Sequence, residues 1–172
     1  SIYNEARGKG IVSTILGAAG SKRNRVVAVG TPNEPFNVAY PASAVKSLDT
    51  KATITFPESQ LYTEEAVAKE SQIYVGRSKE GVAQLNLLTS ILAIEVVANY
   101  DCQIWGIDIT SKSKPLAGVA DVDMSYEEEP TVLFTSVKNN IRLVMESPVA
   151  ISNGASKVFY VAIPAATYDA EE

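Results

Sequence analysis

Carboxylates are the side chains of this sequence whose type and spacing could support chemistry. The acidic run Glu127–Glu129 follows Asp121 and Asp123 closely. Together their oxygens could surround a calcium ion, a hard cation that takes several carboxylate ligands. The spacing matches no EF-hand loop, however, and a run of like charges is usually a solvated surface. We interpret these residues as exposed charge, and we predict no metal site.

A second acidic pair, Glu64 and Glu65, has the residue types of a glycoside hydrolase. The two carboxylates of such an enzyme must face each other across the substrate. Adjacent residues on one loop do not meet that geometry. Asp108 lies between Ile107 and Ile109, so its alternation predicts a side chain that faces solvent and not a pocket.

The composition lacks most of the side chains that nucleophilic catalysis uses. The sequence has no histidine and a single cysteine, Cys102, which excludes Ser-His-Asp and Cys-His systems and most zinc sites. Cys102 lies in an apolar neighbourhood and is predicted to be a buried small hydrophobe. The glycines at 17 and 20 lack both the Lys-Ser/Thr of a phosphate loop and the three-glycine dinucleotide pattern. We predict no catalytic residue, no cofactor and no enzymatic activity.

Composition and charge limit the class of protein. The chain has 172 residues, of which 46% are hydrophobic and 20% charged, so it can bury a core and is not disordered by composition. Its formal net charge is −5, and its longest basic stretch is Lys22–Arg25. Phosphate binding needs basic residues spread over a whole face. The sequence therefore argues against nucleic acid as a partner.

The elements that must position these residues are organised around two apolar runs, residues 85–98 and 103–110. One face of the first run is formed by Leu92, Ile94 and Val96. One face of the second is formed by Trp105, Ile107 and Ile109. The period of two and the β-branched residues predict strands. Because Asn99–Cys102 is short and carries turn formers, we expect the two strands to pair as a hairpin.

Further short strands are predicted along the rest of the chain, with turn signals about every eight to twelve residues, a spacing typical of a sandwich or barrel. The predicted strands are 25–29, 36–40, 52–56, 72–75, 116–124, 131–137, 141–145 and 158–163, with a short strand within 11–16. Residues 76–81 are predicted as a charged turn. Asn139 and Asn140 fit a tight hairpin turn, since asparagine tolerates positive φ. Residues 58–70 are expected to be a loop with one helical turn capped by Thr63.

Aromatic residues leave a second class of function open. The eight tyrosines and Trp105 could line a sugar-binding surface. Most of them fall at alternating strand positions, where core or cross-strand packing is the simpler interpretation. An exposed cluster of Tyr62, Tyr74 and Trp105 would favour a binding module, and burial of these residues would favour a structural protein.

The order of motifs resembles the fimbrillin family, the surface lipoproteins and type V pilins of Bacteroidales-type bacteria. Four stretches carry the resemblance: Phe36–Ser43, Ile54–Tyr62 with its Pro-x-x-Gln-x-Tyr pattern, Leu85–Val96, and Val158–Ala165. The sequence departs from the family at Gln84 or nearby Val82, where phenylalanine is frequent. It departs again at Ala165 and Ala166, where Pro-Gly is frequent.

The resemblance implies an all-β fold, a transthyretin-like antiparallel β-sandwich of about seven main strands with short extra strands. It implies one sandwich domain over residues 1–172, the N-terminal domain of a two-domain subunit. The implied function is a structural subunit or accessory component of a cell-surface pilus, with no enzymatic activity. The alternative is a surface-exposed adhesin or glycan-binding module.

The resemblance also implies partners and a location. The partners are other pilin subunits, joined by β-strand addition, with host or bacterial surface ligands as further candidates. The location is the outer membrane or the extracellular fimbria, through a lipid anchor outside this chain. Proteolysis after an arginine would remove an N-terminal strand and open a groove for a strand of the next subunit. Limited trypsin treatment, which would cut after Arg7, Arg23 or Arg25, can imitate this step. The start at Ser1 and the end at Glu172 are expected to reflect such processing or a cut at a linker. We therefore expect an unpaired edge or an apolar groove along a strand near one terminus.

Overall fold

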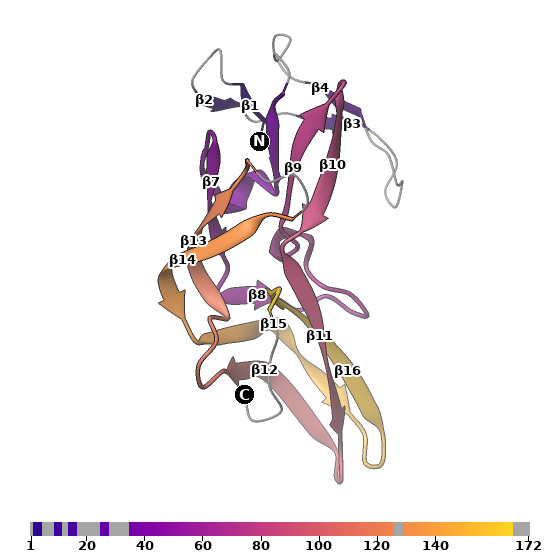
Figure 1. Ribbon diagram of the computed structural model, residues 1–172. Helices are drawn as coiled ribbons and strands as arrows, with labels where there is room; N and C mark the ends of the chain where they lie inside the picture. The colour runs from indigo at the N-terminus through magenta and orange to yellow at the C-terminus, as the bar shows by residue number, and fades with distance from the viewer. Residues whose placement is uncertain are drawn as a thin grey trace.

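A computed structural model describes residues 2–4, 9–11, 14–16, 25–27, 35–125 and 129–166. The first four of these stretches are described by their backbone pairing alone. The described residues form sixteen β-strands and two short 3₁₀ helices, in an elongated arrangement (Figure 1). None of the helices in these residues is long and apolar enough to cross a membrane.

Two sheets form the upper half of the molecule in Figure 1, and we use that name for them below. The first has the order β10 (Val82–Leu87), β9 (Tyr74–Lys79), β5 (Asn37–Tyr40), β1 (Ile2–Asn4), β2 (Lys9–Ile11). The second has the order β14 (Thr131–Lys138), β13 (Ala117–Asp123), β7 (Lys51–Phe56), β6 (Val45–Leu48). Beside them lie a two-stranded ribbon and two 3₁₀ turns: β3 (Thr14–Leu16), β4 (Arg25–Val27), η2 (Ala42–Ala44) and η3 (Lys69–Ser71).

Two smaller sheets form the lower half. One pairs β11 (Thr89–Val97) with β16 (Ser156–Pro164), and the other has the order β12 (Cys102–Thr110), β15 (Asn140–Ile151), β8 (Ser59–Leu61). The β8–β15 pair is parallel, and the other named pairs are antiparallel. The chain is therefore all-β with several antiparallel sheets, as the sequence predicts, although one pair departs from a purely antiparallel pattern.

Alternation of apolar and polar residues places one core in each half. In the upper half, Ala52, Ile54 and Phe56 of β7 share one core with Val122 of the neighbouring β13 and Val75 of β9 in the other sheet. Burial of these apolar faces, at about 25 cal/mol per Å², is the main favourable term that holds the two sheets together.

The lower core has the same origin in the sequence. Residues Phe159 and Val161 of β16 meet Ile141 and Leu143 of β15, and all four are at most 1% exposed. Because successive side chains of a strand point to opposite faces, the residues between them lie on the outside.

The two halves are not contiguous segments of the chain. The strand that begins as β10 continues past Leu88 as β11, and β14 continues past Asn139 as β15. Leu88 donates to Ile73 at 2.8 Å and accepts from Ala165 at 2.9 Å, so it joins both halves. Each long strand therefore serves a different sheet on either side of one residue.

The hairpin expected between the two organising runs does not form. β11 pairs with β16, and β12 pairs with β15, so these neighbours in sequence lie in opposite sheets. The connection at 98–101 crosses from one sheet to the other. Ala98 is buried; its N–H donates to the Ala155 carbonyl and its carbonyl accepts from the Gly154 N–H. These two bonds hold the end of β11 beside the start of β16.

The inward face of β12 also differs from the alternation that we expected. The register shifts between Ile104 and Gly106, which is a β-bulge. Ile104, Ile107 and Ile109 pack on the lower core, whereas Trp105 is 68% exposed. Between these paired positions β12 has one residue, Trp105, whereas β15 has four, residues 145–148. The alternation of β12 shifts by one residue at this irregularity, so Ile104 and Ile107 face the core although they are three positions apart. The prediction that Trp105 shares a face with Ile107 and Ile109 is wrong for this reason.

Three turn predictions also need correction. Asn139 and Asn140 make no hairpin, since β14 pairs with β13 and β15 with β12 and β8. Residues 76–81 mostly extend β9, and only Glu80 and Gly81, both at positive φ, turn the chain into β10. Within 58–70, Thr63 forms an isolated bridge with Ala66, and the helical turn lies later, at η3.

Candidate functional site

The carboxylates considered for calcium do not form a site in the described residues. Glu127 and Glu128 lie outside those residues, and Glu129 is exposed. Asp121 accepts a hydrogen bond from the Thr53 hydroxyl at 3.0 Å. In the described part of the chain, no three carboxylate, cysteine or histidine side chains are grouped so that they could hold a metal ion.

Asp123 is used locally at the end of β13. Its Oδ1 accepts from the Ser125 hydroxyl at 2.6 Å and from the Ser125 backbone N–H at 2.8 Å. These two bonds favour the ionised form, the hydroxyl more strongly, and they lower the pKa of Asp123 below its usual value. The Asp123 carboxylate therefore stabilises the turn at residues 123–125 that follows β13.

Glu64 and Glu65 do not face one another as a catalytic pair. Glu64 accepts a hydrogen bond from the Lys157 ammonium at 2.9 Å, which lowers the pKa of Glu64 and raises that of Lys157. The Tyr62 hydroxyl raises the pKa of Lys157 further. Glu65 is exposed and has a φ of 53°, as expected in a turn.

Asp108 and Cys102, the two other side chains considered above, lie on β12. Asp108 is exposed and lies 3.5 Å from the Arg142 guanidinium on the next strand, in agreement with the predicted solvent-facing position. Cys102 is half-buried at the margin of the lower core, so it is less enclosed than predicted.

The aromatic residues do not gather into one surface. Tyr62 is half-buried against Phe159, with ring centroids 5.5 Å apart, and Tyr74 is half-buried beside Tyr40 at 6.3 Å. Trp105 is exposed, and no ring of the described residues stacks on it. The three residues named as a candidate cluster are therefore in three separate environments.

A hollow between β7, β8 and the two 3₁₀ turns offers little chemistry. Its lining is mostly small and uncharged, and Glu70 is the only charged side chain among the lining residues. General acid–base catalysis on a sugar or ester needs a second positioned group. We assign this hollow no catalytic role.

The feature that stands out is one lateral side of the lower half, which we call the open side. It is bounded by the outer edges of β11 and β12, and no strand of the described residues pairs with either edge. Each strand is nine residues long. Long unpaired edges carry a row of free N–H and C=O groups and are templates for an added strand.

The hydrogen bonds on the opposite edges of β16 and β15 show which backbone groups of β11 and β12 face the open side. Gln60 binds both the N–H and the C=O of Ala162 from outside β16, so Ile91, the partner of Ala162 across the ladder, points its own groups away from β16. Ala93 and Glu95 share this direction because the pattern repeats every two residues.

The same reasoning applies to β12. Arg142 donates its N–H to Glu58 on the β8 side, at 2.8 Å. Its cross-strand partner Asp108 therefore points its backbone N–H and C=O to the outer edge of β12. Both margins of the open side thus present donors and acceptors at alternate residues.

Apolar side chains between these two edges are incompletely covered. Most inward residues of β15 and β16 are buried, with Val149 half-buried, whereas the apolar inward residues of β11 and β12 are half-buried. The half-buried residues of β11 and β12 include Leu92, Ile94, Val96, Ile104, Ile107 and Ile109. The lower core is therefore well buried beside β15 and β16 and only partly buried toward the open side.

The expected unpaired edge is thus present in the described residues, although it belongs to middle strands of the chain and not to a strand near a terminus. Sequence reasoning found the strands but missed the site. The alternation gives each inward face, but it does not say which edges find partners. The two apolar runs, 85–98 and 103–110, differ in length, so their lengths did not indicate that the two strands border one opening.

The N-terminal strand has a special position in the upper half. β1 lies between β5 and β2, with Ile2 opposite Val38 and Tyr3 opposite Asn37. β2 pairs with β1 and with no other strand of the described residues. Arg7 itself lies outside the described residues, as does Arg23.

Comparisons of this chain with protein-family models, with curated proteins and with solved structures find no match.

Proposed function

We propose that this protein is a structural subunit or accessory component of a cell-surface pilus, assembled by strand exchange between subunits. In this proposal the sheets correspond to the transthyretin-like sandwich of the fimbrillins, and the partners are further copies or related subunits. The protein would act outside the cell, at the outer membrane or in the fimbria. The sequence motifs motivate the family, and the open side supports the mode of assembly.

The open side is the observation that carries the proposal. An added strand would bond to the outward groups of Ala93 and Glu95, or to those of Asp108 on the facing edge. Alternate side chains of that strand would cover Ile94 and Ile107, which are half-buried now. Covering an apolar side chain completely contributes on the order of 1 kcal/mol, so several such contacts add to the ladder bonds.

The N-terminal segment is the proposed donor. A cut after Arg7 separates β1 from the rest of the chain, and β2 then loses its only partner among the described strands. The segment that begins after the cut contains the apolar run Ile11–Leu16, which suits an extended strand that fills an apolar groove. Loss of β1 also uncovers the edge of β5 at Val38.

Limited trypsin treatment tests this function, with mass measured by size-exclusion chromatography and light scattering. We expect a monomer before treatment and a ladder of higher masses after the cut at Arg7. Ala93→Pro removes an outward N–H and no bond to β16, because proline is tolerated at a free strand edge. We expect the cut Ala93→Pro protein to remain monomeric.

The matched control is Ala93→Val, which keeps the N–H and should form the same ladder as the wild-type protein. A cut wild-type protein that stays monomeric would contradict assembly by strand exchange. Equal ladders from the cut wild type and Ala93→Pro would place assembly elsewhere than the β11 edge.

A glycan-binding role is the second candidate, and it is supported by Trp105 alone. The indole is 68% exposed on the outer face of β12, and exposed aromatic rings stack on sugars. A glycan array with the uncut protein and with Trp105→Ala tests it. Loss of a specific signal in the variant would support this second function, and absence of any signal would remove it.

A further inference from the structure

The lower half has a second lateral side, between β15 and β16, and there the segment Glu58–Glu64 lies along the opening. We call this segment the strap. Its backbone follows β15: Arg142 donates to the Glu58 carbonyl at 2.8 Å, β8 pairs in parallel, and Tyr62 donates to the Val144 carbonyl at 2.8 Å. The strap thus occupies the edge of one sheet as an added strand would.

Alternate side chains of the strap reach the other sheet. The central one is Gln60, which is 4% exposed. Its Nε2 donates to the Ala162 carbonyl at 2.6 Å, and its Oε1 accepts from the Ala162 N–H at 2.9 Å. One carboxamide therefore satisfies both backbone groups of a β16 residue, in the way a residue of a neighbouring strand would.

The positions on either side of Gln60 continue this pattern. Tyr62 packs on Phe159 of β16, and Glu64 accepts from the Lys157 ammonium at 2.9 Å. Phe159 and Lys157 both precede Ala162 on β16, so the contacts move toward the start of β16 as the strap proceeds from Gln60 to Glu64. This is the order expected for two antiparallel chains that lie side by side. The strap is therefore bound to both sheets over its length.

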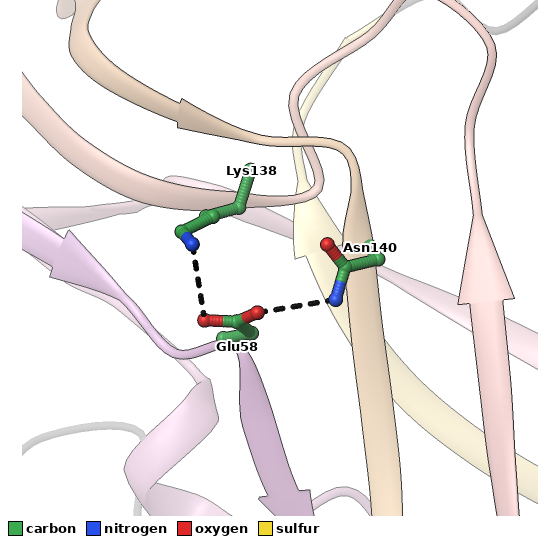
Figure 2. Close-up of polar contacts among 3 residues, drawn as sticks. All are labelled: Glu58, Lys138 and Asn140. Atoms are coloured by element: carbon green, nitrogen blue, oxygen red, sulfur yellow. Dashed lines mark hydrogen bonds and ion pairs between the residues drawn. The ribbon is translucent and has the colours of Figure 1, made fainter.

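Glu58 anchors the beginning of the strap, where Figure 2 shows its carboxylate between two side chains. Oε1 accepts from the Asn140 amide at 3.1 Å, and Oε2 lies 3.9 Å from the Lys138 ammonium. Both partners belong to the stretch where β14 passes into β15. These groups are exposed, so the ion pair contributes little, and the buried Gln60 is the stronger attachment.

We propose that the strap is a built-in closing strand and that Gln60 blocks strand addition at the β16 edge. The Gln60 carboxamide already binds the N–H and the C=O of Ala162, the two groups to which an incoming strand would have to bond. An incoming strand must therefore use another edge, and in the lower half the nine-residue edges of β11 and β12 on the open side have no partner strand among the described residues. The closure at β16 does not depend on the pilus proposal, because it would protect this edge in any soluble or assembled form.

Amide hydrogen exchange of the uncut wild-type protein gives the first test. The N–H of Tyr160 points to the same edge as that of Ala162, but it has no partner among the described residues. We expect exchange at Ala162 to be at least about tenfold slower than at Tyr160, since one bond to a buried group is worth that factor or more. Equal rates at both amides would overturn the proposal.

Gln60→Met gives the second test, because methionine has a similar size and offers no strong hydrogen bonds. We expect exchange at Ala162 to become at least about tenfold faster, and we expect concentration-dependent dimers by light scattering. Gln84→Met, at an exposed position of β10, is the control and should stay monomeric. A Gln60→Met protein that is folded, monomeric and unchanged in exchange at Ala162 would overturn the proposal.

A double variant distinguishes strand addition at the β16 edge from association of partly unfolded protein. Tyr160→Pro removes the next outward N–H of the β16 edge, so Gln60→Met with Tyr160→Pro should return to a monomer. Dimers that persist in the double variant would show that association uses another surface, which would contradict edge closure by Gln60. If Gln60→Met does not fold, the comparison of Ala162 with Tyr160 in the wild-type protein decides the question.

Discussion

Single side chains determine where strands end and which edges stay free. Gln60 closes the backbone of Ala162, and Asp123 closes the end of β13 through Ser125. Neither role is visible in the sequence, because a buried carboxamide and a turn carboxylate have no spacing signature of their own. By contrast, the solvent-facing position of Asp108 follows directly from its apolar neighbours.

Ser125→Ala tests the account at this scale. The Ser125 hydroxyl is the main cause of the lowered pKa of Asp123, so the variant should raise that pKa toward its usual value. A carboxylate with a lowered pKa stabilises the fold above its unfolded pKa, and this stability is lost as the pH falls through the folded pKa. The variant should therefore lose less of its stability on acidification than the wild type.

An NMR pH titration of the Asp123 carboxyl carbon measures the shift, with acid unfolding as a second measurement. Ser90→Ala changes an exposed serine on β11 and serves as the control. The backbone N–H of residue 125 remains in the variant, so part of the shift should persist. An Asp123 pKa that is the same in the wild type and in Ser125→Ala would contradict this assignment.

Elements were predicted with uneven success, for physical reasons. Alternation identifies strands such as β7 and β13, because one buried face imposes a period of two. Pairing was mispredicted at two connections, residues 99–102 and Asn139–Asn140, where the chain passes from one sheet into another. The change of sheet at Leu88 was not predicted either. A local signal cannot report such a change, since both pieces have the same period. The bulge beside Trp105 is hidden in the same way.

Gly118 shows how one residue fixes the register of an element. It lies in β13 with a φ of +128°, and a Cβ there would collide with the Ser136 carbonyl on β14. Gly118→Ala should lower the free energy of unfolding by roughly 2 kcal/mol or more, from strain and displacement of β14. Urea unfolding measures the loss.

Gly154→Ala is the matched control, because Gly154 also has a positive φ, +78°, but its Cβ would meet no atom within 4 Å. It should lower the free energy of unfolding by only about 1 kcal/mol. Equal losses in the two variants would contradict a steric role for the approach of β14 to Gly118.

The whole molecule is an all-β body with two cores, and its two lower sides differ. The strap closes the side at β15 and β16, while the side at β11 and β12 keeps free edges and half-buried apolar residues. The sequence predicts the all-β class and the apolar faces. It does not predict this asymmetry, which depends on contacts between residues about a hundred positions apart, such as Gln60 and Ala162.

Hydrogen exchange of the assembled protein tests the central proposal, strand addition at the open side, most directly. The amides of Ala93, Glu95 and Asp108 point to the free edges, so they should exchange fast in the monomer. After the cut and assembly, we expect strong protection of Ala93 and Glu95, of Asp108, or of all three, with little change at Ala162. Assemblies in which all three amides still exchange as fast as in the monomer would contradict the account.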